Sequence, residues 1–161
     1  MTRREYDRRV RALKARYAYL FAGPHLDHSI APGWLGIVEE LCASIDGVVG
    51  EAERPIVYCQ RIRVKFGGLR VDLSVSPLRL DMTAPDGRNL SCYFGHLRKA
   101  SSERAIFERL EPFVSAAEAR SRVACAFCGA PGELRHGRQG TLTVCDRHAR
   151  SIGATSKLSA K

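Results

Sequence analysis

Four metal-binding side chains near the C-terminus constrain the fold of this chain more than any other feature of its sequence. They form two pairs, Cys125 with Cys128 and Cys145 with His148, and two residues separate the members of each pair. This spacing presents both ligand atoms on one side of a tight turn, and two such pairs complete the tetrahedral coordination that zinc prefers. Gly129 follows Cys128 directly and permits the positive φ of a sharp turn. We therefore predict one zinc ion bound by these four residues.

The segment between the two pairs favours a structural zinc over a redox or a catalytic site. A redox Cys-x-x-Cys follows a strand and opens a helix, whereas a segment rich in glycine and proline follows Cys128 here. A catalytic zinc keeps one coordination position for water, whereas three thiolates and one imidazole fill all four. His136 is an alternative to His148 as the fourth ligand, but its place inside the Gly-rich insert disfavours it.

The residues around the ligands also predict the local structure of the site. The insert begins with Pro131-Gly132 and contains two later glycines, which suits a short hairpin. Residues 142–144 then alternate as in a strand, and residues 145–149 suit the first turn of a helix. A turn, a hairpin and a helix start that share one metal make a treble clef. We expect a treble-clef-like zinc finger over residues 118–150 and a flexible tail over residues 151–161.

The size and composition of the chain describe a globular protein. Its 161 residues suit one domain, or a domain with a small appendage, and 45% hydrophobic residues are enough to bury a core. No apolar run approaches the ~20 residues of a membrane span, and the apolar patch at 17–22 is too short for a signal peptide. Apart from the predicted ligands there are three cysteines, Cys42, Cys59 and Cys92, an odd set that does not suit a disulfide framework. We expect a cytoplasmic protein with no membrane partner.

The charge balance favours an anionic partner. The chain has 26 Lys and Arg residues against 17 Asp and Glu residues, a formal net charge of +9. Such a surface attracts nucleic acid or an acidic protein surface. No small-molecule substrate is expected, because no motif for one is present.

Hydrophobic periodicity predicts three helices. The first begins after a capping box of Thr2 and Glu5 and continues to Gly23-Pro24. The second follows Pro32-Gly33, and the third begins at about residue 103 and is kinked or divided by Pro112. The apolar positions of these helices recur at helical spacing: Tyr6, Val10, Leu13, Tyr17 and Leu20; Trp34, Val38, Leu41, Ile45 and Val48; Ile106, Phe107, Leu110, Phe113, Val114 and Ala117.

Two alternating segments around Gly67-Gly68 predict a β-hairpin. With these glycines as a two-residue turn, the core side pairs Phe66 with Leu69, Val64 with Val71 and Ile62 with Leu73. The other face pairs Lys65 with Arg70 and Arg63 with Asp72. The like-charge pair at the tip is mildly unfavourable alone, which suggests an anionic partner unless solvent simply tolerates it. A second hairpin is expected over residues 78–94, with its turn at 84–87.

Basic residues of the hairpin and of the finger make up the predicted binding surface. They are Arg61, Arg63, Lys65, Arg70, Arg135, Arg138, Arg147 and Arg150. No aromatic residue interleaves these cations, so base stacking lacks an obvious platform.

The loop with His25, Asp27 and His28 is the second group of potential metal ligands or acid–base residues. Loops often carry such side chains for solubility alone. We therefore expect these histidines to be solvated rather than coordinated.

Several motifs of the chain resemble a group of small, uncharacterised bacterial and phage-encoded proteins. These are Gly33-Trp34 with Leu41-Cys42, the Lys-Phe-Gly-Gly-Leu-Arg hairpin over residues 65–70, and the Cys-x-x-Cys-Gly-Ala-Pro-Gly to Cys-x-x-His ending over 125–148. The chain departs from this pattern at Val64, Val71-Asp72 and Gly140-Thr141. The resemblance implies a zinc site and a phage-type setting but supplies no reaction.

Together these patterns predict an α+β fold, with a small antiparallel sheet and helices on one side of it over residues 1–117. The first functional hypothesis is a non-enzymatic zinc-finger protein that contacts nucleic acid or a nucleoprotein complex. The second is an inhibitor or adaptor of the phage or mobile-element type that binds a host defence or regulatory protein. The third is a metal-dependent nuclease. A nuclease needs a histidine base and an open metal position, and the predicted finger has neither, so only His25, Asp27 and His28 support this hypothesis.

Overall fold

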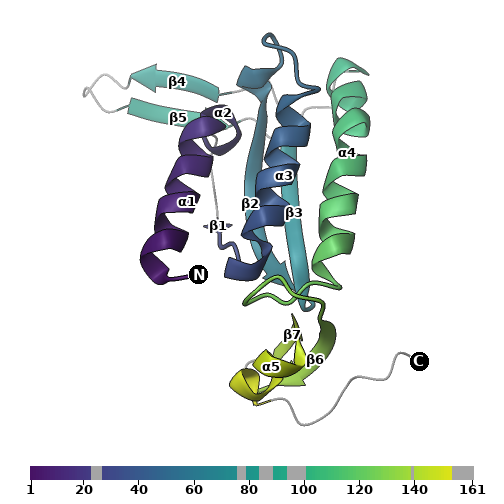
Figure 1. Cartoon of the computed structure of the whole chain (residues 1–161). Coiled ribbons are helices and arrows are strands. Elements are labelled where there is room, and N and C mark those ends of the chain that lie inside the picture. The colour runs from purple at the N-terminus through teal and green to yellow at the C-terminus, as the bar shows by residue number, and fades with distance from the viewer. Residues whose placement is uncertain (23–26, 76–78, 84–88, 94–100, 139, 154–161) are drawn as a thin grey trace.

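The computed structural model describes residues 1–22, 27–75, 79–83, 89–93, 101–138 and 140–153 (Figure 1). Five helices and seven strands follow one another along these residues. Their bounds are α1 Arg3–Arg16, α2 Ala18–Phe21, β1 Asp27–His28, α3 Leu35–Asp46, β2 Val57–Lys65, β3 Gly68–Val75, β4 Arg79–Thr83, β5 Asn89–Tyr93, α4 Ser101–Ser121, β6 Glu133–Gly137, β7 Gly140–Val144 and α5 Asp146–Ala149. Short 3₁₀ turns lie at Pro32–Trp34, Arg54–Ile56 and Arg150–Ile152.

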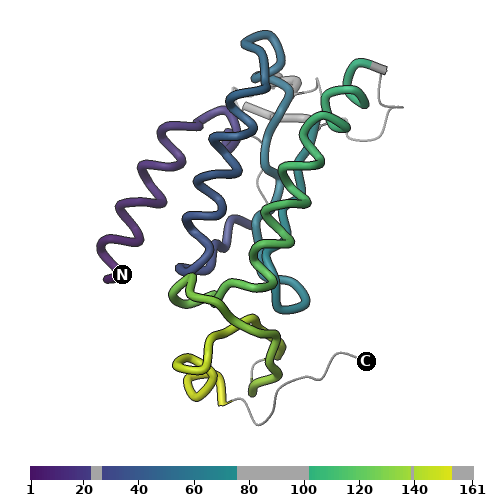
Figure 2. Tube along the Cα trace, turned by 45° about the vertical axis from the view of Figure 1, so that its right-hand side comes forward, coloured from purple at the N-terminus to yellow at the C-terminus, as the bar shows by residue number. Residues whose placement is uncertain are grey.

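The core forms between one sheet and three helices. Strands β1, β2 and β3 make a sheet in that order, and α3 lies in front of it with α1 and α4 on either side (Figures 1 and 2). Side chains from the three helices and from β2 and β3 are buried in one cluster, which includes Leu13, Ile45, Ile62, Val71 and Leu110. The expected mixture of helices with a small sheet is confirmed. The sheet is not purely antiparallel, however, because β1 pairs with β2 in parallel.

The ends of α1 and α3 differ in detail from the prediction. Thr2 caps α1 as expected, since its Oγ1 accepts a hydrogen bond of 3.2 Å from the Glu5 N–H. The helix then ends at Arg16, where Tyr17 adopts a non-helical φ of −115°, and α2 follows as a separate turn. Helix α3 ends at Asp46, so Val48 is exposed and Val49 is buried in its place.

Helix α4 is a single helix of 21 residues rather than two short ones, although Pro112 lies inside it. Proline removes the hydrogen bond to the carbonyl of Glu108, four residues earlier. Both residues are exposed, so water can satisfy that carbonyl. The buried face of α4, with Ile106, Leu110 and Ala117, is therefore continuous across the proline.

The β2–β3 hairpin forms as predicted, but its turn lies one residue earlier. Phe66 and Gly67 have positive φ values of 53° and 79°, as a type I′ turn requires, and Lys65 pairs with Gly68. The predicted cross-strand pairs are therefore wrong: Val64 faces Leu69, Ile62 faces Val71, Cys59 faces Leu73 beyond a bulge, Arg63 faces Arg70 and Arg61 faces Asp72. Val64 and Phe66, predicted to be in the core, are 40% and 86% exposed. The second hairpin, β4–β5, is confirmed, and its turn lies outside the described residues.

Two side chains of α4 satisfy the free edge of β3. Ser121 Oγ accepts a hydrogen bond of 2.8 Å from the Leu69 N–H, and Glu118 Oε1 accepts one of 3.1 Å from the Val71 N–H. The other oxygen of Glu118 accepts a bond of 2.7 Å from Arg70. An edge strand with unpaired N–H groups invites pairing with other chains, and α4 covers these two.

We expect Glu118→Ala to lower the free energy of unfolding by about 2 kcal/mol, because it leaves a buried N–H without an acceptor. Glu118→Gln keeps an acceptor for Val71 and should cost less. Glu111→Ala, at an exposed position of the same helix, is the control and should change stability by less than about 0.5 kcal/mol. Urea unfolding monitored by circular dichroism measures all three. An effect of Glu118→Ala as small as that of the control would show that this edge contact does not contribute.

Candidate metal centre

Cys125, Cys128, Cys145 and His148 lie together and can hold one metal ion. Their ligand atoms all lie within 4.8 Å of one another. Cys128 Sγ is 3.8 Å from Cys145 Sγ, and His148 Nδ1 is 3.6 Å from Cys125 Sγ and 3.2 Å from Cys145 Sγ. The local spacing of the two pairs therefore predicted correctly that these four residues lie together.

These separations fit tetrahedral coordination. Zinc–sulfur bonds of about 2.3 Å and zinc–nitrogen bonds of about 2.0 Å place two sulfurs about 3.8 Å apart, and a sulfur and a nitrogen about 3.5 Å apart. The Cys128–Cys145 and Cys125–His148 separations match these values, and the Cys145–His148 separation is shorter by about 0.3 Å. The ring nitrogen that faces the sulfurs is Nδ1 of His148. His136, the alternative ligand, instead lies 3.3 Å from Thr141 Oγ1 across the β6–β7 hairpin.

Local backbone hydrogen bonds shape the two ligand pairs. At the first pair, the Gly129 N–H donates to the Cys125 carbonyl at 2.8 Å, and Gly129 has the expected positive φ, 76°. At the second pair, the His148 N–H donates to the Cys145 carbonyl at 3.0 Å as α5 begins. The β6–β7 hairpin joins the pairs, as predicted. The Phe127 ring stacks on the His148 ring, with centroids 5.2 Å apart.

The environment of the sulfurs is mixed but includes donors that favour thiolate. Burial would raise the pKa of Cys125, yet backbone hydrogen bonds from Cys145, Cys128 and Phe127 lower it overall. The backbone hydrogen bond from His148 lowers the pKa of Cys145. At Cys128 the backbone hydrogen bond from Ala130 lowers the pKa, but burial and the neighbouring sulfurs raise it more. Thiolate is the form of cysteine that binds metal.

The first ligand pair is packed against the start of α3, a contact that sequence reasoning did not predict. The Gly33 N–H donates to the Ala126 carbonyl at 2.7 Å, and Trp34 Nε1 donates to the Ala124 carbonyl at 2.8 Å. A Cβ atom on Gly33 would lie 2.1 Å from the Cys125 carbonyl oxygen. Trp34 is fully buried. The adjacent residues Gly33 and Trp34 could have indicated this contact, since a glycine permits a close backbone approach and a buried indole N–H needs an acceptor.

The second contact joins the β2–β3 hairpin tip to the β6–β7 hairpin. The Thr143 N–H donates to the Gly67 carbonyl at 2.9 Å, and Gly67 forms a bridge with Leu142. A Cβ atom on Gly67 would lie 2.2 Å from Leu134 Cδ1. The C-terminal segment, residues 122–153, is thus attached to both α3 and the sheet, and it continues directly from α4 (Figure 2).

A pocket of about 370 Å³ opens beside this second contact. The hairpin tip contributes Lys65, Phe66, Leu69 and Arg70 to it. The C-terminal segment contributes Arg122, Leu134 and Thr143. We call it the tip pocket.

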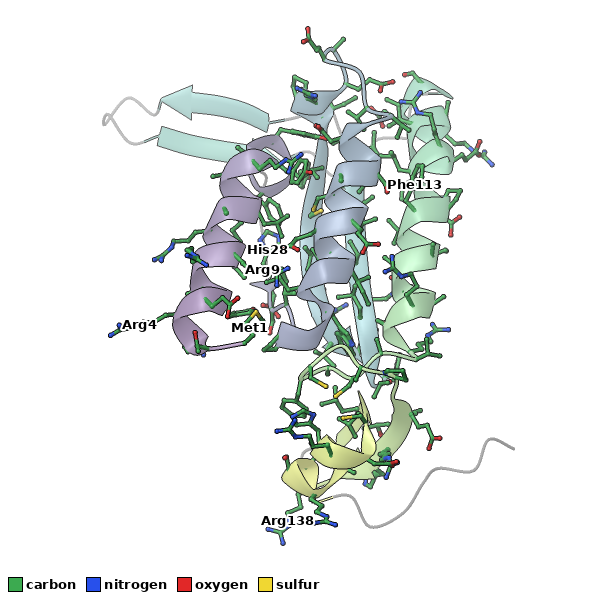
Figure 3. All side chains as sticks on the ribbon, in the orientation of Figure 1. Met1, Arg4, Arg9, His28, Phe113 and Arg138 are labelled. Carbon is green, nitrogen blue, oxygen red and sulfur yellow. The ribbon has the colours of Figure 1, made fainter. Side chains whose placement is uncertain are left out.

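The basic residues predicted to bind a partner do not form one surface. Arg63, Arg70 and Arg135 are engaged in ion pairs with Asp72, Glu118 and Asp146, respectively, and the Arg135 side chain is only 12% exposed. Arg61 is half-buried opposite Asp72. Arg147 and Arg150 are exposed beside the second ligand pair, and Arg138 lies at the far end of the C-terminal segment (Figure 3). Of these predicted residues, only Lys65 and Arg70 come together at the tip pocket. Arg122, which was not predicted from the sequence, lines the same pocket.

The other residues considered as metal ligands or acid–base groups do not form a second centre. Among the described residues, the four ligands are the only cluster suited to a metal ion. His28 is not a solvated loop residue, because it lies in β1 with Nε2 2.9 Å from the Cys59 carbonyl oxygen and its ring against Phe21. Asp27 is exposed, and His25 lies outside the described residues. Cys42 and Cys59 are buried, and burial raises the pKa of Cys42 to about 12, so it stays a thiol.

The described helices also include none that is long and apolar enough to cross a membrane. No protein-family model, curated protein or solved structure matches the chain.

Proposed function

We propose that the chain binds one zinc ion at the four-residue cluster and that this zinc has a structural role. The carrying observation is the ligand set itself, three sulfurs and one imidazole nitrogen within 4.8 Å of one another. Four protein ligands complete a tetrahedron and leave no position for substrate or water, which is the arrangement of structural zinc sites. The order of turn, hairpin and short helix around the cluster supports the treble-clef class.

The zinc would hold together parts of the chain that are distant in sequence. The first ligand pair contacts the start of α3, and β7, which ends just before Cys145, contacts the β2–β3 hairpin tip. A metal that fixes the two pairs relative to each other therefore also fixes α3 and the hairpin tip relative to the C-terminal segment. Such a site stabilises a surface made from both parts.

We propose that this surface, at the tip pocket, binds nucleic acid without catalysis. Lys65 and Arg122 are exposed there, and among the described residues no carboxylate is paired with either. No residue that lines the described pocket is acidic. Cations without local acidic partners are suited to phosphate contacts, and the +9 net charge favours approach of a polyanion.

Salt dependence tests this proposal. Each phosphate contact releases condensed counterions, so log affinity should fall with log salt by about 0.9 per contact on duplex DNA and about 0.7 on single strands. The double substitution Lys65→Gln and Arg122→Gln should reduce the magnitude of this slope by roughly 1.4 to 1.8. Fluorescence anisotropy of labelled oligonucleotides between low and moderate salt provides the measurement.

The control for this experiment is Arg104→Gln. Arg104 lies near the start of α4, at the end opposite the tip pocket, and pairs with Glu108. The control should leave the slope unchanged. Equal effects of the control and the double variant would place the phosphate contacts elsewhere, and the absence of binding at low salt would contradict the proposal.

A second candidate function is binding of a host defence or regulatory protein, as an inhibitor or adaptor of the phage or mobile-element type. The observation that favours it is the group of exposed apolar side chains Val64, Phe66 and Leu134 near the same tip. Apolar side chains that are exposed together mark protein contacts. A pull-down from host lysate with and without nuclease separates the two functions, because one protein retained after nuclease treatment favours this candidate. A nuclease is the weakest candidate, since the four ligands leave no open metal position.

A further inference from the structure

We infer that the tip pocket takes one unpaired nucleobase, so that the chain prefers single-stranded nucleic acid to a duplex. This inference rests on the proposed nucleic-acid binding and specifies its ligand. It starts from Phe66, which is 86% exposed and lines the pocket.

Phe66 occupies a position that does not suit it structurally. Its φ of 53° lies in the left-handed region, which glycine, asparagine and aspartate adopt far more readily than a bulky residue. The ring gains little burial in return, because most of it faces solvent. A backbone outlier with an exposed aromatic ring calls for a role outside the fold. Stacking on a flat ligand is such a role.

The backbone beneath Phe66 is held firmly. The Gly67 carbonyl accepts the Thr143 N–H at 2.9 Å, and Leu69 N–H is bound to Ser121 at 2.8 Å. Gly67 is buried against Leu134, so the turn cannot tilt toward the C-terminal segment. The ring is thus presented by a fixed turn, which lowers the ordering cost of a ligand that stacks on it.

The charges around the ring suit the phosphates on either side of a base. Lys65 Nζ lies over one face of the Phe66 ring, 5.1 Å from its centroid, so a base would stack on the other face, and Arg122 lines the same pocket from the C-terminal segment. Arg70 also lines it, but its guanidinium is paired with Glu118. An exposed aromatic ring in a basic groove is the arrangement by which proteins bind single strands without reading sequence. The pocket volume of about 370 Å³ lies within the range of small-ligand sites.

An unpaired base fits this site better than a duplex does. In a duplex both faces of each base are already stacked, so Phe66 would have to separate two base pairs, which costs free energy. A single strand offers a free base face without that cost. Leu69 and Leu134 give the pocket an apolar lining, which suits the flat face of a base rather than a sugar or a phosphate.

The test compares zinc-loaded wild type, Phe66→Ala and Phe66→Trp on labelled oligo-dT, oligo-U and a duplex of the same length. Wild type should bind a single strand at least about 10-fold more tightly than the duplex, and the two single-strand arms distinguish DNA from RNA. Phe66→Ala should weaken single-strand binding by about 5- to 150-fold, the effect of losing one base–aromatic stack. It should leave the salt slope unchanged, because the lost contact is not ionic.

Phe66→Trp provides a direct readout of stacking. Its new indole should be exposed, whereas the native Trp34 is fully buried, so the oligonucleotide should quench the emission of the variant and not that of wild type. Equal affinity for single strand and duplex, together with a neutral Phe66→Ala, would overturn this inference and leave the proposed function standing. Absence of binding to all three oligonucleotides would overturn both.

Discussion

Cys145→Ser is expected to abolish zinc binding and to unfold the C-terminal segment. The zinc content measured by elemental analysis should fall from about one per chain to nearly none, because a site with three protein ligands binds zinc more weakly and the folding of this segment depends on the metal. The C-terminal segment buries only a small cluster of its own, Cys125, Val144 and Ala149. A structural zinc contributes on the order of 10 kcal/mol to folding such segments. Loss of the zinc should therefore remove the signals of the β6–β7 amides from the NMR spectrum.

His136→Ala is the matched control for this loss of zinc. His136 lies in the hairpin between the two ligand pairs, is exposed, and is the alternative ligand suggested by the sequence. Its replacement should leave the zinc content unchanged. A full complement of zinc in Cys145→Ser, or its loss in His136→Ala, would show that the ligands are assigned wrongly.

The consequences of losing zinc should extend beyond the C-terminal segment. Trp34 is buried, and its Nε1 donates to the Ala124 carbonyl three residues after α4 ends. If residues 122–153 unfold, this donor loses its acceptor and the indole is no longer fully covered. We expect the tryptophan emission of Cys145→Ser to shift to longer wavelength. Because Trp34 is the only tryptophan of the chain, the shift is unambiguous.

The metal site could be predicted from sequence because its information is local. The two members of each ligand pair are three positions apart, and Gly129 follows Cys128 directly, so a short segment shows the whole pattern. The helices were predictable for the same reason, since buried positions such as Leu41 and Ile45 recur at helical spacing. Treble-clef class and the metal's identity depend on more than this spacing and stay predictions.

The hairpin shows where local reasoning fails. Gly67-Gly68 is the better turn by intrinsic preference, because both glycines tolerate positive φ. The chain instead places Phe66 and Gly67 in the turn and keeps Gly68 in β3. A Cβ on Gly68 would lie 3.3 Å from Ser121 Oγ, so α4 packs closely over this glycine. Tertiary packing therefore set the register, and it moved Phe66 from the predicted core to the surface.

Contacts between distant segments also could not be predicted from the sequence. No periodicity relates the start of α3 to the first ligand pair, which lies about ninety residues later. Glu118, the first residue of the predicted finger segment, is a buried acceptor for the edge of β3. Glu118 also forms an ion pair with Arg70, which neutralises that cation. Charge patterns in the sequence cannot reveal which cations are already neutralised in this way.

The contact between Gly33 and the first ligand pair leads to the second prediction with a large effect. Gly33→Ala should lower the free energy of unfolding of the zinc-loaded chain by about 3 kcal/mol, the upper part of the range for overpacking. The added Cβ would lie 2.1 Å from the Cys125 oxygen, 2.5 Å from the Gly129 nitrogen and 2.7 Å from the Cys128 nitrogen. All three are backbone atoms, so the turn that carries the sulfurs has to move as a whole.

Gly36→Ala, three residues further along, provides the control. A Cβ at Gly36 would meet nothing within 4 Å, and the residue lies inside α3. Alanine is the better helix former, so this variant should be unchanged or more stable by up to about 1 kcal/mol. Urea unfolding compares the two variants, and the rate at which a chelator removes zinc reports on the ligand turn itself. Gly33→Ala should release zinc faster than wild type, and Gly36→Ala should not. If Gly33→Ala unfolded and released zinc like Gly36→Ala, the first ligand pair would not be packed against α3, and the zinc would stabilise the C-terminal segment alone.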